Sequence, residues 1–206
     1  MINVELEGRL LTLTLNRPDK ANSLTRLMLE ELDAALAQAE MKGVRAVILT
    51  GAGHVFSAGA DLEDARAGLA SDPVWERLSA RIAGLPILTI AALNGTLAGG
   101  AMGMVLACDL RLTVPGAKFF YPVMKLGFLP QPSDPRRMAA LIGPARSKMI
   151  LMGGARIDAA EAYAWGLVDR IVAPEVLLDE ARTLAADVMA AHADHVAAIK
   201  RLVPSA

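Results

Sequence analysis

The stretch IAALNGTLAGGAMGMVLACD, residues 90–109, sets the organisation of the chain. An apolar run that begins at Ile87 meets the turn signal Asn94-Gly95, and Gly99-Gly100 then opens a second apolar run with helical spacing. The pattern predicts a strand, a glycine-rich loop and a helix that begins at the loop. The first turn of a helix leaves N–H donors without partners, and glycines let a ligand oxygen approach them. A tight strand-to-helix packing contact without a ligand is the alternative.

A second loop has the same design. The β-branched run Val44 to Thr50 predicts a buried parallel strand, and small residues crowd the segment from Gly51 to Leu62 that follows it. Asp61 is placed to cap a short helix from Leu62 to Ala67, and a plain cap without a ligand is the alternative. Two such loops on neighbouring strands would offer two N–H groups to one oxygen, which is an oxyanion hole.

Composition limits the classes of protein. The 206 residues, 54% apolar and 21% charged, are typical of one compact domain, or of one domain with a small appendage. A formal charge of −1 gives no basic field, so nucleic acid is not an expected partner. The single Cys108 excludes an internal disulfide, and the N-terminus lacks a signal-peptide pattern. Residues 97–107 are too short an apolar run to cross a bilayer, so we expect a cytoplasmic protein without membrane association.

Periodicity predicts the remaining elements. Residues 2–7 and 9–15 alternate as a hairpin, and residues 63–85 contain an amphipathic helix, read as a surface helix with a lid as the alternative. Further helices are expected at Thr25–Met41, Ala159–Trp165, Glu175–Ala191 and Ala193–Val203, and a last strand at Leu167–Val172. His54, His192 and His195 are scattered without metal-ligand spacing, so no metal site is expected.

Several motifs together carry a family resemblance. Residues 16–24 (NRPDKANSL), Gly51 to Leu62 and Asn94 to Gly100, in this order and spacing, resemble the enoyl-CoA hydratase/isomerase (crotonase) family. Weaker matches follow at Cys108–Arg111, Pro122, Gly127–Pro130, Ala159–Ala162 and Gly166–Asp169. The resemblance implies an α/β fold, a crotonase-like spiral of ββα units over residues 1–172 with a helical C-terminal segment over 173–206. It also implies trimers or dimers of trimers.

The resemblance further implies an acyl-CoA thioester ligand. The amides of Ala60 and Gly100 match the two donors that hold the thioester oxygen. The CoA-binding positions that it implies are Lys20, Ala21, Ala58, Asp61 and Leu62, with Lys20 and Ala21 along the nucleotide part and Ala58 beside the adenine. No separate cofactor is expected, because coenzyme A is part of the substrate.

The chain departs from the family at two positions that the resemblance assigns to glutamates. They are Gly103, three residues after the oxyanion glycine, and Val123, after the proline of the next segment. Neither residue transfers a proton, whereas hydration of a conjugated thioester needs an acid or base at both faces, each worth roughly 10²- to 10⁴-fold in rate. The sequence therefore does not support the usual hydratase mechanism.

Other residues are candidates for proton transfer. Gln131 occupies the slot where some relatives place an aspartate, and it is not a general base. Asp134 is a candidate acid three residues further on; the favoured alternative is an exposed turn residue beside Arg136 and Arg137. Tyr121 could project its phenol near the site, and a buried tyrosine with a satisfied hydroxyl is the favoured alternative.

Two functions are compatible with the sequence. One is an atypical lyase or isomerase that acts through a CoA enolate. The other is a catalytically inactive CoA-thioester-binding or scaffold protein. Compared with the family, the chain lacks the terminal helices that usually cover the acyl pocket. We therefore expect a homo-oligomer that covers the exposed apolar surface, and a more open acyl pocket.

Overall fold

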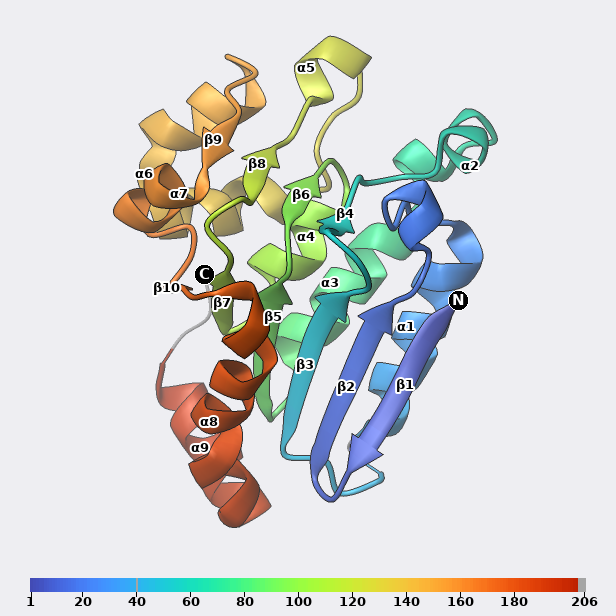
Figure 1. Ribbon diagram of the computed structural model, residues 1–206. Coiled ribbons are helices and arrows are strands. Elements are labelled where there is room, and N and C mark those ends of the chain that lie inside the picture. Colours follow the sequence, from blue (N-terminus) through green and yellow to red (C-terminus); the bar gives the residue numbers. More distant parts are fainter. Residues whose placement is uncertain (40, 204–206) are drawn as a thin grey trace.

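The computed structural model describes residues 1–39 and 41–203, which build two sheets with helices on both sides (Figure 1). The six-stranded sheet has the order β1-β2-β3-β5-β7-β10, and the four-stranded sheet has the order β4-β6-β8-β9. The strands are β1 Ile2–Glu7, β2 Leu10–Leu15, β3 Ala46–Gly51, β4 Val55–Ser57, β5 Leu88–Leu93, β6 Thr96–Ala98, β7 Leu110–Thr113, β8 Lys118–Phe120, β9 Ile157–Asp158 and β10 Arg170–Ile171.

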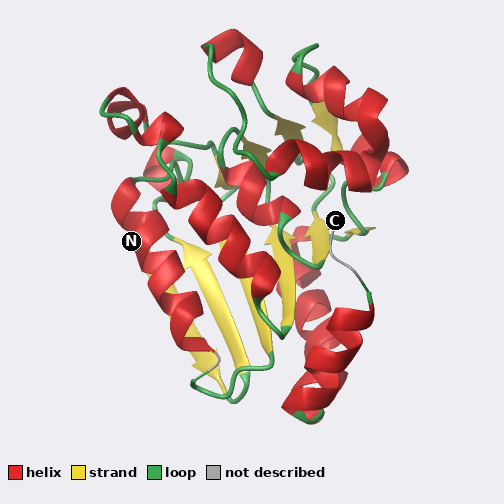
Figure 2. Cartoon of the chain, turned by 180° about the vertical axis from the view of Figure 1, so that it is seen from behind, coloured by secondary structure: helices red, strands yellow, loops and turns green. Residues whose placement is uncertain are grey.

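The helices cover both faces of the large sheet. They are α1 Arg26–Ala39, α2 Leu62–Arg66, α3 Val74–Gly84, α4 Ala101–Leu106, α5 Val123–Leu126, α6 Asp134–Leu151, α7 Ala159–Trp165, α8 Leu177–Ala190 and α9 Ala193–Leu202, with 3₁₀ turns at Pro18–Lys20, Leu69–Ser71 and Pro174–Val176. Seen from behind, α1 and α3 pack side by side across this sheet (Figure 2). On the other side, α8 contacts β3, β5 and β7.

The chain repeats one path three times. From a parallel strand of the large sheet (β3, β5, β7) it enters a strand of the small sheet (β4, β6, β8) and continues into a helix. β3 pairs with β5 and β5 with β7, while β4 pairs with β6 and β6 with β8, all in parallel. Successive turns of the path therefore stack, and the segments after β4 and β6 start from neighbouring strands. This arrangement confirms the predicted spiral of ββα units.

Most of the predicted elements are present, with different bounds. The hairpin, the parallel strand near residue 46 and the helix after Asp158 are confirmed. The predicted strand Leu167–Val172 is shorter, because only Arg170 and Ile171 pair with β7. The helix expected from Glu175 begins at Leu177, since Pro174 starts a 3₁₀ turn instead. Residue 40, inside the helix expected at Thr25–Met41, lies outside the described residues.

The amphipathic surface helix expected in residues 63–85 is α3. Its apolar side chains Trp75, Leu78 and Ile82 are buried in the main core, while its opposite face, with Arg77 and Ala80, is exposed. Its apolar stripe faces α1 and α4, so its place in the fold depends on contacts that local periodicity does not reveal. α4 is buried at every position from Ala101 to Leu106, as expected for a helix enclosed by other elements.

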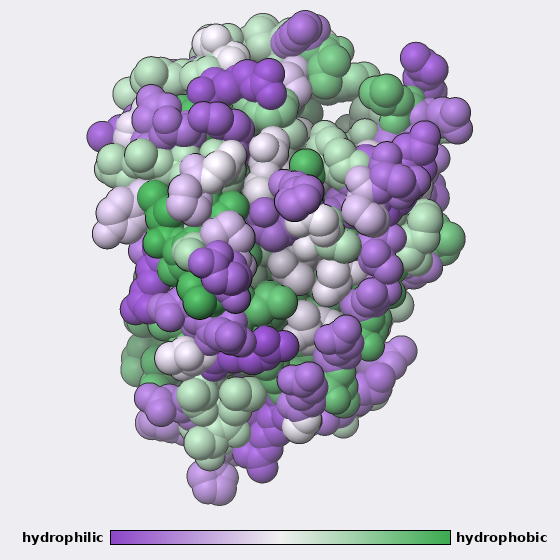
Figure 3. Space-filling model, viewed as in Figure 1, coloured by the Kyte–Doolittle hydropathy of each residue, from purple (hydrophilic) through white to green (hydrophobic). Residues whose placement is uncertain are grey.

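The surface mixes polar and apolar side chains (Figure 3). Exposed apolar residues gather on α5 and the segment after it, where Met124, Leu126, Phe128 and Leu129 are exposed. Among residues 1–39 and 41–203, no helix has the length and apolar character needed to cross a bilayer. The same residues contain no group of three or more His, Cys, Asp or Glu side chains placed to hold a metal ion.

Candidate active site

The loops after β4 and β6 touch each other through two glycines. A Cβ atom built on Gly59 would lie 3.0 Å from the Ala98 carbonyl oxygen and 3.2 Å from the Gly99 Cα. Gly59 also has φ +93°, which only glycine adopts readily. The contact brings together the two segments that the sequence predicted as ligand loops.

One amide in each loop remains available. The Gly99 N–H donates to the Phe120 carbonyl at 3.1 Å, but the Gly100 N–H, at the N-terminus of α4, has no acceptor among the described residues. The Ala60 N–H likewise donates to no residue in the described part of the chain. Both residues are partly exposed. A free N–H group at the start of a helix also carries the positive end of the helix dipole.

The position of Ala60 is fixed by its neighbours in the chain. The Leu24 N–H donates to the Gly59 carbonyl at 2.8 Å, and the Asp61 N–H donates to the Leu24 carbonyl at 2.9 Å. Asp61 is held in turn by Arg17, whose Nη1 lies 2.6 Å from the carboxylate Oδ2. These bonds use the groups on either side of Ala60 and leave its own N–H free.

Asp61 acts as the predicted helix cap. Its Oδ1 accepts from the Glu63 N–H at 3.0 Å and from the Asp64 N–H at 3.5 Å, at the start of α2. The hydrogen bond from the Arg17 guanidinium lowers the pKa of the Asp61 carboxyl below its ordinary value. Because both carboxylate oxygens have protein partners, Asp61 has a structural task whether or not a ligand binds.

The other predicted CoA-binding positions surround the same loop. The Ala58 N–H donates to the Ala21 carbonyl at 3.0 Å, and both Ala21 and Asn22 adopt positive φ angles. The Asn22 side chain donates to carbonyl oxygens of the 51–57 loop and holds that backbone in place. Lys20 is exposed beside it, and Leu62 is 74% exposed. Composition offered no direct signal for this network, although an asparagine at positive φ is a common turn residue.

Asp134 is buried, so the favoured prediction of an exposed turn residue is wrong. It is 0% exposed, and its Oδ2 accepts a hydrogen bond of 2.9 Å from the Tyr121 hydroxyl. Its own N–H donates to the Gln131 carbonyl at 3.0 Å, which makes Asp134 the first residue of α6 and turns its side chain inward. The flanking prolines signal the turn correctly but not the direction of the side chain that follows it.

Tyr121 is buried with a satisfied hydroxyl, as the favoured alternative expected. Its partner, however, is the other candidate for proton transfer. Arg136, in contrast, is exposed, while Arg137 is buried and its Nη1 has no hydrogen-bond partner among the described residues. The structure thus brings together two residues that the sequence treated separately.

The Asp134 carboxyl is poised between its two charge states. Burial raises its pKa to about 7, against the opposing effects of the Tyr121 hydrogen bond and of the nearby Arg137 charge. The Glu76 carboxylate on α3 raises this pKa further. The Tyr121 phenol is also shielded from water, and burial raises its pKa well above the ordinary value, so it remains neutral.

The helix α4 lies between the free amide and the buried carboxyl. A Cβ atom at Gly103 would lie 2.7 Å from the Asp134 Oδ1, and one at Gly100 would lie 3.2 to 3.3 Å from the ring of Trp75. The Trp75 indole N–H donates to the Leu69 carbonyl at 2.8 Å, which fixes the ring against the helix. Residues three apart share one face of a helix, so Trp75 and Asp134 cover adjacent turns of the same face.

The two positions assigned to glutamates carry no proton-transferring group. Gly103 lies inside α4, and Val123 is buried at the start of α5.

His54 is exposed in the turn before β4, as predicted. Trp75 was missed as a residue of this site, and its only signal in the sequence is a rare aromatic residue after a small-residue loop.

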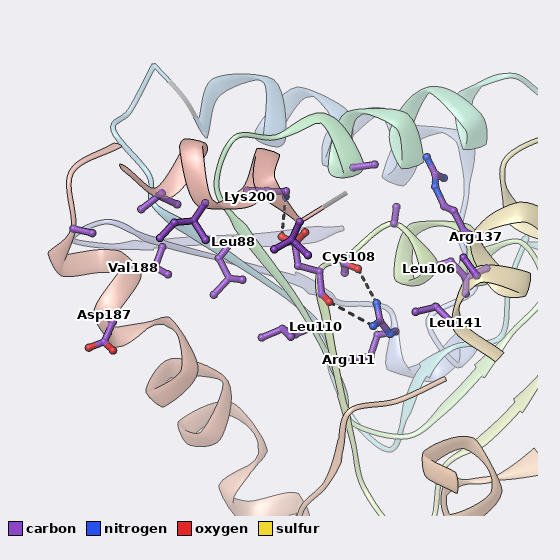
Figure 4. A pocket seen from close by; sticks show the side chains of 18 of the residues that line it. Leu88, Leu106, Cys108, Leu110, Arg111, Arg137, Leu141, Asp187, Val188 and Lys200 are labelled. Atoms are coloured by element: carbon purple, nitrogen blue, oxygen red, sulfur yellow. Dashed lines mark hydrogen bonds and ion pairs between the residues drawn. The ribbon is translucent and has the colours of Figure 1, made fainter. Parts of the chain in front are cut away.

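A cavity of about 830 Å³ lies elsewhere, between α8, α9, the end of α4 and α6 (Figure 4). Leu88, Leu106, Leu110, Leu141 and Val188 give it apolar walls, and Lys200 at its edge forms an ion pair of 2.7 Å with Asp109. None of the predicted site residues lines it. We place the candidate site at the two loops, because both free N–H donors lie there and the buried Asp134 carboxyl lies against α4, the helix that follows Gly100.

Comparison with known proteins identifies the family of the chain. A model described as "Enoyl-CoA hydratase/isomerase" matches residues 5–205. The chain is 34% identical over 193 residues to the short-chain-enoyl-CoA hydratase of Clostridium acetobutylicum, covering 88% of this chain and 72% of that protein. It is 33% identical over 190 residues to the 1,2-epoxyphenylacetyl-CoA isomerase of Escherichia coli, covering 87% and 72%.

The solved structures agree with these matches. The crystal structure of an enoyl-CoA hydratase from Bacillus anthracis superposes with a TM-score of 0.90 at 34% sequence identity, covering 97% of this chain and 81% of that chain. A family match over nearly the whole sequence, together with this superposition, confirms the predicted resemblance. The chain belongs to the enoyl-CoA hydratase/isomerase (crotonase) family.

Proposed function

We propose that this protein binds an acyl-CoA thioester and stabilises its enolate between the N–H groups of Ala60 and Gly100. The observation that carries the proposal is the pair of unpartnered amides on two loops in backbone contact. When a proton leaves the carbon beside a thioester carbonyl, negative charge collects on one oxygen. Two fixed N–H donors stabilise that charge, and the loss of one such donor typically costs about 3 to 4 kcal/mol in the transition state.

The CoA part of the ligand would lie along the outer side of the first loop. Lys20 supplies an exposed positive charge for a phosphate, and the backbone at Ala21 and Ala58 offers polar groups beside it. The relatives named for action on CoA thioesters make this ligand class the natural one to test. Coenzyme A enters as part of the substrate, so no separate cofactor is invoked.

Enolate chemistry of the lyase or isomerase type suits this site better than hydration. Addition of water needs one group to activate the water and a second to protonate carbon. Gly103 and Val123 provide neither, and one buried carboxyl lies beside α4. Reactions that need an enolate and one proton-transferring group remain compatible with these residues.

The first experiment measures binding and turnover side by side. Calorimetry with butyryl-CoA and with free CoA reports binding, and steady-state assays with crotonyl-CoA, a 3-enoyl-CoA and malonyl-CoA report turnover. We expect micromolar binding that depends on the thioester, with turnover of the enoyl or malonyl ester and without hydration of crotonyl-CoA at ordinary enzyme rates. Absence of thioester binding would overturn the proposal.

A catalytically inactive thioester-binding protein is the second candidate. The observation that favours it is the missing carboxyl at both glutamate positions. Binding of butyryl-CoA without turnover of any of the three esters would decide for this candidate. Rapid hydration of crotonyl-CoA would contradict our interpretation of Gly103 and Val123.

We also expect a homo-oligomer, a trimer or a dimer of trimers. The exposed apolar side chains on α5 and the following segment, with Leu129 88% exposed, support an interface there. Light scattering of the purified protein measures the assembly mass directly. A monomer at micromolar concentration would contradict this expectation.

A further inference from the structure

We propose that Asp134 is the proton-transferring carboxyl of this site, carried by the first turn of α6, and that glycine at position 103 of α4 provides the space it occupies. The inference rests on the proposed function, because it assumes a thioester oxygen held by Ala60 and Gly100. It adds the group that moves the proton and the class of reaction that follows.

The Asp134 carboxyl occupies the space beside Gly103. A Cβ atom on Gly103 would lie 2.7 Å from Oδ1, 3.1 Å from Oδ2 and 3.3 Å from Cγ of Asp134. The whole carboxyl group therefore fills the volume in which a side chain at position 103 would begin. A side chain at position 103 of α4 and the Asp134 carboxyl from α6 therefore exclude each other. The buried position of Asp134 requires glycine at position 103.

Gly103 lies close to Gly100 along α4. Gly103 lies three residues after Gly100, close to one helical turn, so both face the same side of the helix about 5 Å apart. A carboxyl against Gly103 thus lies one turn from the N–H that would hold the thioester oxygen. A carboxylate reaching out from position 103 itself would leave the helix at the same point.

One oxygen of the Asp134 carboxyl is unpaired among the residues that the structure describes. Asp134 Oδ1 has no hydrogen-bond partner in the described part of the chain, although the residue is 0% exposed. A buried carboxyl oxygen without a partner costs stability, and such atoms in native structures call for an explanation. Removal of a proton from a bound ligand would use this free oxygen.

Tyr121 is the positioning residue of the pair. Its hydroxyl donates to Oδ2 and leaves Oδ1 free, which fixes the orientation of the carboxyl. The residue before it, Phe120, accepts the hydrogen bond from the Gly99 N–H at 3.1 Å. The pair is therefore tied to the same loop that presents the Gly100 amide.

The charged and titratable groups around the carboxyl come from three elements. Tyr121 faces it from the segment after β8, Arg137 from the next turn of α6, and Glu76 from α3. Glu76 also accepts hydrogen bonds from the Ser133 N–H at 3.1 Å and from the Ser133 hydroxyl, which fixes the start of α6 against α3. In these surroundings the pKa of Asp134 is about 7, a value at which a carboxyl both takes and returns protons at neutral pH.

A single carboxyl is sufficient for isomerisation of a carbon–carbon double bond. Asp134 takes a proton from the carbon beside the thioester carbonyl of a 3-enoyl-CoA: the C–H bond breaks, an O–H bond forms, and the electron pair moves onto the thioester oxygen. The same carboxyl then returns the proton to the far end of the conjugated system. The double bond moves next to the carbonyl, and neither water nor an oxidant enters.

The experiment uses 3-hexenoyl-CoA as substrate, with conjugation followed by ultraviolet absorbance, and butyryl-CoA as the binding probe. For Asp134→Asn we expect at least a 100-fold loss of kcat with an unchanged Kd for butyryl-CoA. Asp194→Asn, at an exposed position on α9, is the matched control and should keep the wild-type rate. Proton exchange of butyryl-CoA in D₂O should fall in parallel.

Two further variants separate chemistry from structure. The double variant Gly103→Glu with Asp134→Gly returns the carboxyl to α4 and should recover at least 10-fold of the rate lost in Asp134→Asn. Tyr121→Phe should lower kcat roughly three- to tenfold, because the carboxyl loses the bond that orients it, and should raise the apparent pKa of kcat above its wild-type value, because the removed hydrogen bond lowers the pKa of Asp134. A purely structural tyrosine would leave the pH profile where it is.

The outcomes distinguish the two proposals. A wild-type rate in Asp134→Asn, with thioester binding intact, overturns the role of Asp134 and leaves the proposed function standing. A folded double variant that binds butyryl-CoA without recovering activity overturns the steric exchange. Binding without isomerisation or proton exchange in the wild type overturns the inference in favour of a binding protein. Absence of butyryl-CoA binding removes the proposed function itself.

Discussion

The two halves of the candidate site are built from different parts of the chain. Ala60 and Gly100 offer main-chain N–H groups whose place is set by strand pairing and by the start of α4. Asp134 and Tyr121 offer side-chain atoms that meet only because α6 packs on α4. Main-chain donors persist through substitution of side chains, whereas a carboxyl is lost or gained by one substitution. If the proposed function holds, the two N–H donors of this site would survive substitutions that move the proton-transferring carboxyl from one element to another.

The largest expected effect tests the side-chain half through stability. Asp134 binds its proton up to about pH 7 in the folded state, but only up to its ordinary value near 3.8 when unfolded. The folded state therefore binds more protons between these values, and the free energy of unfolding falls as pH rises from about 4 to 7, by up to about 4 kcal/mol. Urea unfolding between pH 4 and 8 measures this slope, and Asp134→Asn should flatten it. If Asp134→Asn kept the wild-type slope, a group other than Asp134 would be responsible for the pH dependence.

The next effect tests the main-chain half. Gly100 has φ −59°, which proline also adopts, so Gly100→Pro removes the N–H without demanding a new backbone angle. Gly100→Ala keeps the N–H and brings the same Cβ against Trp75, which makes it the matched control. We expect proline to lower kcat roughly 10²- to 10³-fold relative to alanine. Equal rates in the two variants would remove this amide from catalysis.

A smaller effect on stability is expected at Gly103, where the helix that begins at Gly100 meets the Asp134 carboxyl. Gly103→Ala forces a methyl group against the Asp134 carboxyl at 2.7 Å, and we expect a loss of about 1 to 3 kcal/mol in the free energy of unfolding. Gly84→Ala, in α3 with nothing within 4 Å of the new methyl, should be neutral or stabilise by up to about 1 kcal/mol. Chemical denaturation of both variants gives the comparison.

The smallest effect tests how firmly the main-chain half is held. Arg17→Lys keeps the positive charge but loses the planar group that reaches both Asp61 and the Ser23 carbonyl. We expect roughly a three- to tenfold fall in kcat with little change in KM, because the ion pair fixes Asp61 and thereby the position of Ala60 directly before it. A change confined to KM would show that Arg17 acts on ligand binding instead.

The main-chain half was predictable because local chemistry determines it. Paired glycines after an apolar run, and Asp61 before Leu62, predict loop-to-helix junctions from a few neighbouring residues. The structure has both junctions and brings the loops into contact. The roles of Ala60 and Gly100 in holding a ligand remain predictions.

The side-chain half was not predictable to the same degree. Asp134 is 31 positions from Gly103 in sequence, and its burial depends on how α6 lies across α4, a packing that no local pattern determines. The place of Trp75 in the site could not be predicted for the same reason, since its ring meets Gly100 only through a tertiary contact. Turn residues such as the prolines around Asp134 predict where the chain bends and not where the next side chain points.

The parallel pairing of β4 with β6 has a consequence for the lengths of the segments that follow these strands. Val55 is aligned with Thr96 and Ser57 with Leu97, so the pairing slips by one residue at the buried Phe56. Ala60 lies three residues after Ser57 and Gly100 lies three residues after Leu97, so the two segments from this aligned pair to the two donors have equal length. Inserting or deleting one residue in either segment would rotate one donor away from the other while leaving every side chain intact. The spacing of these segments, more than their composition, therefore determines whether both N–H vectors converge on the same anion.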